Sequence, residues 1–397
     1  MHKVYLKPGK EESLKRFHPW IFSGAIARFD GEPEEGEVVE VYTSKKEFIA
    51  EGHFQIGSIA VRVLSFRQEP IDHDFWKRKL QIAYDMRCGI GIAVNPTNDT
   101  YRLVHGEGDN LPGLVIDIYA RTAVMQAHSA GMHVDRMTIA EALSEVMGDK
   151  IENIYYKSET TLPFKADLFP ENGFLKGGSS DNIAQEYGLK FHVDWLKGQK
   201  TGFFLDQKYN RLAIQRICKD AKVLDCFTHT GSFALNAGIA GASSVLGVDA
   251  SELAIAQARE NAALNGLEST VSFECRDVFD LLPELESKGE QFDVVILDPP
   301  AFTKSRNSIK NAVKGYREIN LRAMKLVRDG GFLATCSCSH FMDFELFTKT
   351  IKQAAMNSHV RLRQVEFRTQ APDHPILWAA DESYYLKFYI FQVIKER

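Results

Sequence analysis

The chain has 397 residues, of which 44% are hydrophobic and 25% charged, and its formal net charge is −5. This composition is typical of a soluble globular protein, and the length predicts two or three domains. The negative charge argues against a general nucleic-acid coat, although a local basic surface is enough to neutralise phosphates.

Hydropathy and cysteine usage indicate the compartment. No apolar run is long enough to cross a bilayer and residues 1–4 begin no signal peptide, which predicts a protein without membrane attachment. The cysteines lack the spacing of a metal site or of a secreted disulfide framework. We therefore expect reduced thiols, no metal and a cytoplasmic location. The six cysteines are Cys88, Cys218, Cys226, Cys275, Cys336 and Cys338.

Residues 1–70 predict a small β-barrel, because short alternating strands such as 37–42 are separated by glycine turns. Lys15 and Arg16 precede an aromatic stretch, 17–22, and these residue types bind phosphates and stack on unpaired bases. We therefore predict that Lys15 and Arg16 bind RNA. The apolar residues of the stretch are more simply explained as the core of the barrel.

Residues 71–184 predict a small mixed α+β domain. The segment carries no motif with recognisable chemistry, so we expect it to act as a spacer or to orient a substrate. Its predicted elements are a helix at 74–88, a hairpin of 114–118 with 123–126, a helix at about 134–147 and a strand at 153–157.

Residues 185–397 predict a doubly wound parallel sheet, because short apolar strands alternate with helices. Four of these strands lead into an acidic residue. Because the carboxyl ends of parallel strands face one ligand crevice, we expect the four carboxylates to gather there. They are Asp225, Asp249, Asp277 and Asp298.

The turn after the first of these strands indicates the class of cofactor. It contains a single glycine and lacks the G-x-G-x-x-G pattern that brings backbone close to a pyrophosphate. S-adenosylmethionine has no phosphate and tolerates such a turn. The predicted site has Asp225 at the ammonium, Asp249 at the ribose, Asp277 at the adenine, and Phe227, Thr230 and Gly231 in the turn, whose amides meet the carboxylate.

The fourth and fifth strands of this domain predict the reaction. Asp298 ends the fourth strand, and Cys338 lies near the end of the neighbouring strand, 331–339. Neighbouring strands lie about 4.8 Å apart, so both side chains can reach one base. Methylation of cytosine at C5 requires a thiolate that adds to C6, and we predict that Cys338 supplies it with Asp298 near N3.

Other residues near this edge have simpler interpretations. Cys336 shares a strand face with Cys338 by the two-residue period, and we expect it deeper, as a small hydrophobe. Cys226 is expected to pack inside its strand. His340 could take the proton from C5, although a surface histidine is the simpler interpretation.

At 298–302 and 335–339 the sequence resembles the bacterial ribosomal large-subunit RNA cytosine-C5 methyltransferases that carry an N-terminal PUA domain. The resemblance covers nearly the whole chain. It implies an α/β fold with a C-terminal Rossmann-like class I methyltransferase domain, an N-terminal PUA-like β-barrel that docks RNA, and a small central α+β domain. Further matching segments are 15–22, 107–114, 198–207 and 373–375.

The resemblance also implies residue roles. Cys338 would be the nucleophile, Asp298 would assist at the base, and the stretch containing Lys200 and Gln207 would in part close over S-adenosylmethionine. One departure is that Ala301-Phe302 stands where other cytosine-C5 RNA methyltransferases have a second cysteine. The sequence therefore does not indicate what promotes release of the methylated product.

Alternative functions stay open at this point. A base methyltransferase without a nucleophile, for example at guanine N7, would need no cysteine at 338. An RNA-binding protein with an inactive methyltransferase domain would not need four strand-end acids, and methylation of a protein amide or amine is disfavoured by the PUA-like segment. The expected partner is large-subunit ribosomal RNA, and a homodimer is one of the assemblies left open.

Overall fold

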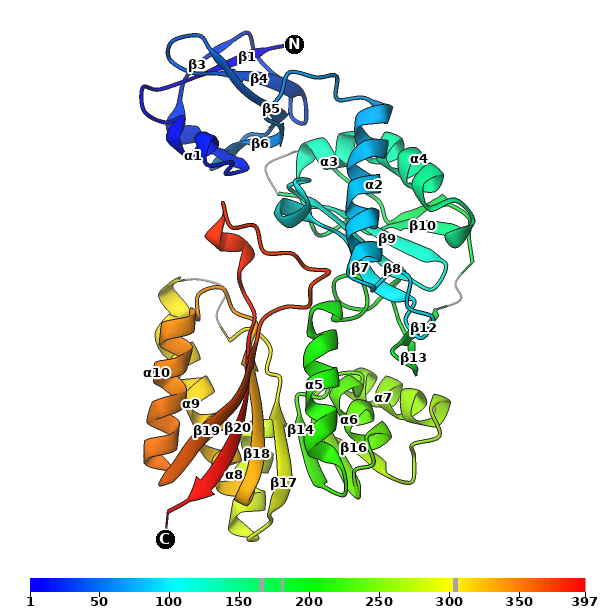
Figure 1. Cartoon of the computed structure of the whole chain (residues 1–397), viewed down its shortest axis with the longest axis vertical. Coiled ribbons are helices and arrows are strands. Elements are labelled where there is room, and N and C mark those ends of the chain that lie inside the picture. Colours follow the sequence, from blue (N-terminus) through cyan, green and yellow to red (C-terminus); the bar gives the residue numbers. More distant parts are fainter. Residues whose placement is uncertain (164–167, 180–181, 303–305, 397) are drawn as a thin grey trace. The chain divides into compact units, whose positions relative to one another are not determined.

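The computed structural model describes residues 1–163, 168–179, 182–302 and 306–396, and Figure 1 shows the chain. The chain forms two compact units. The N-terminal unit contains Met1–Gly188, Val193–Leu205 and Pro372–Ser383, and the C-terminal unit contains Leu189–His192, Asp206–Ala371 and Tyr384–Arg397. The proposed domains 1–70, 71–184 and 185–397 divide the chain differently, because two later segments fold with the N-terminal unit. Among the described residues, no helix combines the length and the apolarity needed to cross a membrane.

The first sheet of the N-terminal unit has six strands in the order β2-β6-β5-β4-β1-β3. The two end strands are consecutive in the chain, separated only by the 3-10 turn Ser23–Ala25, so the edges of the sheet approach each other as in a barrel. Its interior holds Val4, Val39, Val41 and Val61. The strands are β1 (Lys3–Leu6), β2 (Trp20–Phe22), β3 (Ile26–Asp30), β4 (Val38–Tyr42), β5 (Phe48–Phe54) and β6 (Ile59–Ser65), with helix α1 (Glu12–Lys15) between β1 and β2.

The second sheet of this unit has five strands in the order β11-β10-β9-β8-β7. The predicted hairpin is confirmed, because β8 and β9 pair antiparallel. The predicted helix at 134–147 begins earlier and is broken at Asp135. The elements of this part of the chain are α2 (His73–Gly89), β7 (Thr100–His105), β8 (Leu114–Tyr119), β9 (Thr122–Ala127), α3 (Ala130–Val134), α4 (Arg136–Met147), β10 (Asn153–Tyr156), β11 (Gly173–Lys176) and β12 (Ile183–Glu186), of which β12 lies outside the five-stranded sheet.

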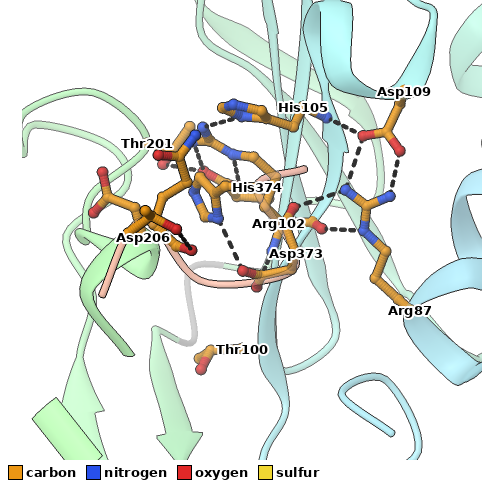
Figure 2. Close-up of polar contacts among 12 residues, drawn as sticks. Arg87, Thr100, Arg102, His105, Asp109, Thr201, Asp206, Asp373 and His374 are labelled. Atoms are coloured by element: carbon orange, nitrogen blue, oxygen red, sulfur yellow. Dashed lines mark hydrogen bonds and ion pairs between the residues drawn. The ribbon is translucent and has the colours of Figure 1, made fainter. Parts of the chain in front are cut away.

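A buried polar network joins the late segment Pro372–Ser383 to the second sheet (Figure 2). Arg87 of α2 contacts the Asp109 carboxylate through both terminal nitrogens and donates to the carbonyl oxygen of Asp373 at 2.7 Å. The Asp373 carboxylate accepts from the Arg102 amide at 3.1 Å and is hydrogen-bonded to the His374 ring at 2.8 Å. Residues 373–375, which the family resemblance included, therefore attach the late segment to α2 and β7 of this unit.

The C-terminal unit has a seven-stranded sheet in the order β16-β15-β14-β17-β18-β20-β19. The first five strands are parallel, and β20 runs antiparallel between β18 and β19. The fold class predicted from sequence is confirmed. The strands are β14 (Lys222–Cys226), β15 (Ser244–Asp249), β16 (Val271–Cys275), β17 (Phe292–Leu297), β18 (Val327–Ser337), β19 (Val360–Arg368) and β20 (Lys387–Lys395), with β13 (Leu189–His192) outside this sheet.

Helices cover both faces of this sheet, with α5 to α7 on one side and α8 to α10 on the other (Figure 1). Apolar residues at three- and four-residue spacing give each helix a buried face; in α9 these include Tyr316, Ile319 and Ala323. The helices are α5 (Lys208–Cys218), α6 (Ser232–Ile239), α7 (Glu252–Leu264), α8 (Val278–Ser287), α9 (Ile309–Leu326) and α10 (Phe344–Asn357).

Candidate functional site

The turn between β14 and α6 has a compact, strained backbone. Phe227, His229 and Gly231 have positive φ angles of 64°, 51° and 84°. A Cβ atom at Gly231 would lie 2.8 Å from Cζ of Phe273, so only glycine fits there. The turn thus brings its amides to the carboxyl end of the sheet, where the sequence predicted the cofactor.

Asp225 is buried beneath this turn. Its Oδ2 accepts from the Thr228 hydroxyl at 2.5 Å and from the Ala234 amide at 3.0 Å. Burial raises the pKa of Asp225 to about 8, and the nearby carboxylates of Asp298 and Asp249 also raise it. The charges of Asp298 and Asp249 thus both act on Asp225, so three of the four predicted acids gather here, and a cation bound at Asp225 would relieve this repulsion.

Asp249 and Asp277 each organise the backbone at their strand ends. Asp249 accepts from the His229 amide and the Ser251 amide, both at 3.0 Å. Asp277 caps α8 by accepting from the Phe279 amide at 2.8 Å. Since each carboxylate oxygen can accept further hydrogen bonds, both residues still have capacity to bind a ligand.

The residues around this turn fit S-adenosylmethionine. Among the described residues, Oδ1 of Asp225 and Oγ1 of Thr230 are buried polar atoms without a hydrogen-bond partner. A buried polar atom without a hydrogen bond costs free energy, and a ligand can remove that cost by supplying the missing hydrogen bond. An ammonium group can donate such a bond to a carboxylate. Asp225 and Thr230 would hold the amino-acid end of the cofactor, and Asp249 would hold its ribose.

A second cluster lies at the ends of β17 and β18. The strands pair in parallel with Leu297 opposite Thr335, so Asp298 stands beside Cys336. Oδ1 of Asp298 accepts from Nε2 of Gln207 and from Sγ of Cys336, both at 2.9 Å. Burial raises the pKa of Asp298 to about 6, while the Cys336 hydrogen bond acts in the opposite direction.

The two cysteines have different environments. Cys336 is fully buried, and burial together with Asp298 raises the pKa of its thiol well above the usual value, so it stays protonated. Our interpretation of Cys336 as a small hydrophobe was therefore incomplete, because its thiol is a hydrogen-bond donor to Asp298. β18 ends at Ser337, earlier than predicted, so Cys338 is the first residue after the strand. Cys338 is half-buried, with Sγ 4.0 Å from the carbonyl oxygen of Pro299.

Four more predicted residues have defined surroundings. Gln207 bridges Asp298 and Cys336, with Nε2 3.3 Å from Sγ of Cys336. Lys200 belongs to the N-terminal unit, is exposed, and has Nζ 4.8 Å from the ring centroid of Phe204, so its role at the cofactor stays a prediction. Lys15 is exposed and pairs with Glu12 at 2.7 Å; Arg16, next to it, is also exposed.

The remaining expectations concern single side chains. Cys226 is buried in the core, as expected, and His340 is exposed. Sequence reasoning missed Tyr316 and Lys387, which lie near the cysteines. The hydroxyl of Tyr316 accepts from the Ser337 hydroxyl at 3.1 Å, and Nζ of Lys387 donates to the Ser339 carbonyl at 2.7 Å. No sequence motif indicates these two residues, because they lie in α9 and β20, outside the segment that contains the two cysteines.

Comparisons with known proteins agree with this architecture. Residues 4–66 match the PUA-like domain, and residues 175–388 match the S-adenosylmethionine-dependent methyltransferase family. Ribosomal RNA large subunit methyltransferase I of Aliivibrio fischeri is 41% identical over 98% of this chain and 99% of its own. The protein of the same name from Aeromonas salmonicida is 40% identical over 97% of both chains. A solved SAM-dependent methyltransferase from Streptococcus mutans shares the fold, with a TM-score of 0.83 at 20% identity over 99% of this chain and 100% of that one.

Proposed function

The chain belongs to the family of S-adenosylmethionine-dependent methyltransferases that includes ribosomal RNA large subunit methyltransferase I, and from this membership we propose that it methylates cytosine at C5 in large-subunit ribosomal RNA. Cys338 is the nucleophile and Asp298 assists at the base. The observation that carries the proposal is that Cys338 and Asp298 flank one strand end, with Sγ of Cys338 facing the carbonyl of Pro299, the residue after Asp298.

The cofactor supplies an electrophilic methyl group when it is bound. The carboxylate of Asp225 would hold its ammonium, Asp249 would accept from its ribose hydroxyls, and Asp277 and the turn around Gly231 would complete the site. They hold the donor and leave the activation of the base to other residues.

The base is activated by covalent addition. The Cys338 thiolate forms a bond to C6, and the electron pair of the C5–C6 double bond makes C5 nucleophilic. The bound cofactor would supply the methyl group that C5 takes up, and its sulfonium sulfur would keep the electron pair of the broken methyl–sulfur bond. A base then removes the C5 proton, and the electron pair of the C5–H bond re-forms the C5–C6 double bond. The bond between C6 and sulfur breaks, which regenerates the Cys338 thiolate.

Asp298 is suited to stabilise charge on the ring. Its pKa of about 6 lets it carry a proton for part of the time near neutral pH, so it can donate to N3 of cytosine during addition. Oδ1 is fixed by Gln207 and Cys336, whereas Oδ2 accepts no hydrogen bond from any described residue. Oδ2 is therefore the oxygen that faces the base in this proposal.

RNA docking belongs to the PUA-like domain in this proposal. Lys15 and Arg16 are exposed on and beside α1, and the exposed ring of Phe17 follows them. Basic and aromatic side chains in this combination bind phosphates and stack on unpaired bases.

A trapping experiment tests the nucleophile. In RNA that carries 5-fluorocytosine, fluorine cannot leave C5 as a proton does, so the thioether to C6 persists. We expect a covalent adduct with the wild-type protein and cofactor, attached to the peptide that contains Cys338. Cys338→Ala abolishes the adduct, and Cys336→Ser, which keeps a hydrogen-bond donor to Asp298, retains it.

The RNA in this experiment is a large-subunit fragment into which the wild-type protein transfers labelled methyl groups. Methyl transfer without an adduct, or an adduct in the Cys338→Ala protein, contradicts the proposal. Digestion of the labelled RNA to nucleosides identifies the product, and 7-methylguanosine in place of 5-methylcytidine would support a mechanism without a nucleophile.

A further inference from the structure

Lys387 is a buried cation at the start of β20. Its backbone pairs with Ser337, the last residue of β18. Directly paired residues of antiparallel strands project to the same face, and Ser337 contacts Tyr316 of α9 there. Lys387 is 1% exposed, so its side chain lies inside the C-terminal unit, near the residues that follow the end of β18.

The ammonium of Lys387 is held by backbone carbonyls. Nζ donates to the carbonyl oxygen of Ser339 and to that of Tyr385, both at 2.7 Å. No carboxylate among the described residues lies within ion-pair distance of it. A buried charge without a counter-ion is costly, and its retention beside a reactive group indicates a role for the charge.

The groups that act on Lys387 come from several elements. Burial lowers the pKa of Lys387 to about 8, whereas Cys338, Asp343 at the start of α10, and Cys336 all raise it. Tyr316 of α9 lies near both cysteines, whose charges would raise its pKa, and Asp298 accepts a hydrogen bond from Cys336. On β19, Arg368 is paired with Glu366. Lys387 is thus electrostatically coupled to the thiol of Cys338.

We propose that Lys387 is a positioning residue for the nucleophile: its ammonium fixes the carbonyl of Ser339, next to Cys338, and its charge favours the Cys338 thiolate. The backbone hydrogen bond sets where the thiol stands after the strand ends. The positive charge lowers the free energy of the thiolate relative to the thiol, which raises the nucleophilic fraction near neutral pH. The inference rests on the proposed function only in taking Cys338 as the nucleophile.

Alkylation of Cys338 without RNA tests this proposal. The rate of iodoacetamide reaction is followed from about pH 6 to 10, with the modified cysteine identified by peptide mass spectrometry. In Lys387→Met we expect the midpoint for Cys338 to rise by about one unit, so that its rate at neutral pH falls about tenfold. Cys275, which is exposed on β16, is the internal reference and keeps its midpoint.

Two further variants separate charge from hydrogen bonding. Lys387→Arg keeps the charge and retains the low midpoint, whereas Lys387→Gln keeps a donor to Ser339 but raises the midpoint as Met does. A low midpoint in Lys387→Gln would overturn the role of the charge. Binding of S-adenosylhomocysteine and an unchanged melting curve establish that each variant is folded; if Met does not fold, the Gln and Arg pair decides.

Failure of the Lys387 inference can be distinguished from failure of the proposed function. An adduct that persists in Cys338→Ala would remove Cys338 from the reaction, yet the alkylation midpoints would be unaffected. Conversely, an unchanged midpoint in all three Lys387 variants would overturn this inference while the adduct still formed through Cys338.

Discussion

At the scale of single residues, the chemistry depends on carboxyl groups whose protonation is set by burial. Asp225 and Asp298 are both buried at the ends of their strands, and the charge of Asp298 helps to raise the pKa of Asp225. Burial is the first cause in both cases. Asp225 is therefore mainly protonated at neutral pH, whereas Asp298 is mainly ionised and carries a proton only part of the time; a bound cation or an incoming base shifts both equilibria.

Cofactor affinity should depend on pH through Asp225. Below about pH 8 the carboxyl carries a proton in the free protein, and it must lose that proton to pair with the cofactor's ammonium. We expect affinity for S-adenosylmethionine to rise from pH 6 to 7.5, by up to tenfold per unit for one released proton. Calorimetry in buffers of different ionisation heat measures both affinity and proton release.

The measurement stops at pH 7.5 because the cofactor's own amino group titrates near pH 8. Asp225→Asn should bind weakly with no rise over this range. Asp277→Asn is the matched control, because Asp277 caps α8 and should alter affinity without removing the pH dependence. A wild-type affinity that is flat between pH 6 and 7.5 argues against a cation contact at Asp225.

At the scale of elements, helix α2 carries a buried ion pair. Asp72 caps the helix by accepting from the Phe75 amide at 3.0 Å, and an apolar face with Trp76 packs inward. Arg87 in the last turn continues that face and is fully buried with Asp109. This cation holds the distant Asp373 through its carbonyl, so one helix end fixes a segment from the other end of the chain.

Arg87→Met should destabilise the N-terminal unit by about 3–5 kcal/mol, because it leaves the Asp109 carboxylate buried and unpaired. Hydrogen exchange should show lost protection at Pro372–Ser383. Lys77→Met on the same helix is the control, since Lys77 forms an exposed pair with Glu145 and its loss should have a much smaller effect on stability. Equal effects of the two substitutions would mean that burial of the Arg87 pair is unimportant.

At the scale of the whole molecule, the negative net charge argues against non-specific RNA binding over the whole surface. The net charge is −5, so affinity for RNA must come from local basic groups. The exposed cations of the PUA-like domain that the sequence indicated are Lys15 and Arg16, and the first is partly neutralised by Glu12.

Replacing both cations with Gln should weaken binding to single-stranded large-subunit RNA fragments and reduce the salt dependence. Each lost phosphate contact lowers the slope of log affinity against log salt by about 0.7. Fluorescence anisotropy at several salt concentrations measures this slope. Lys45→Gln with Lys46→Gln, on the exposed turn before β5, removes the same charge; if both double variants lower the slope equally, Lys15 and Arg16 form no specific site.

The sequence by itself determined the local features: strand and helix periods, the single-glycine turn at Gly231, and the acids that end parallel strands. These follow from neighbours in the chain, so the sheet, the cofactor class and the position of Asp225, Asp249 and Asp298 were predictable. The tertiary structure decided which distant groups meet. Only the tertiary fold brings Gln207, from the turn before α5, and Cys336, from β18, to Asp298, and brings Lys387 to the carbonyl next to Cys338. The physical reason is that protonation and reactivity depend on burial and on charges from other elements, and sequence spacing carries no information about either.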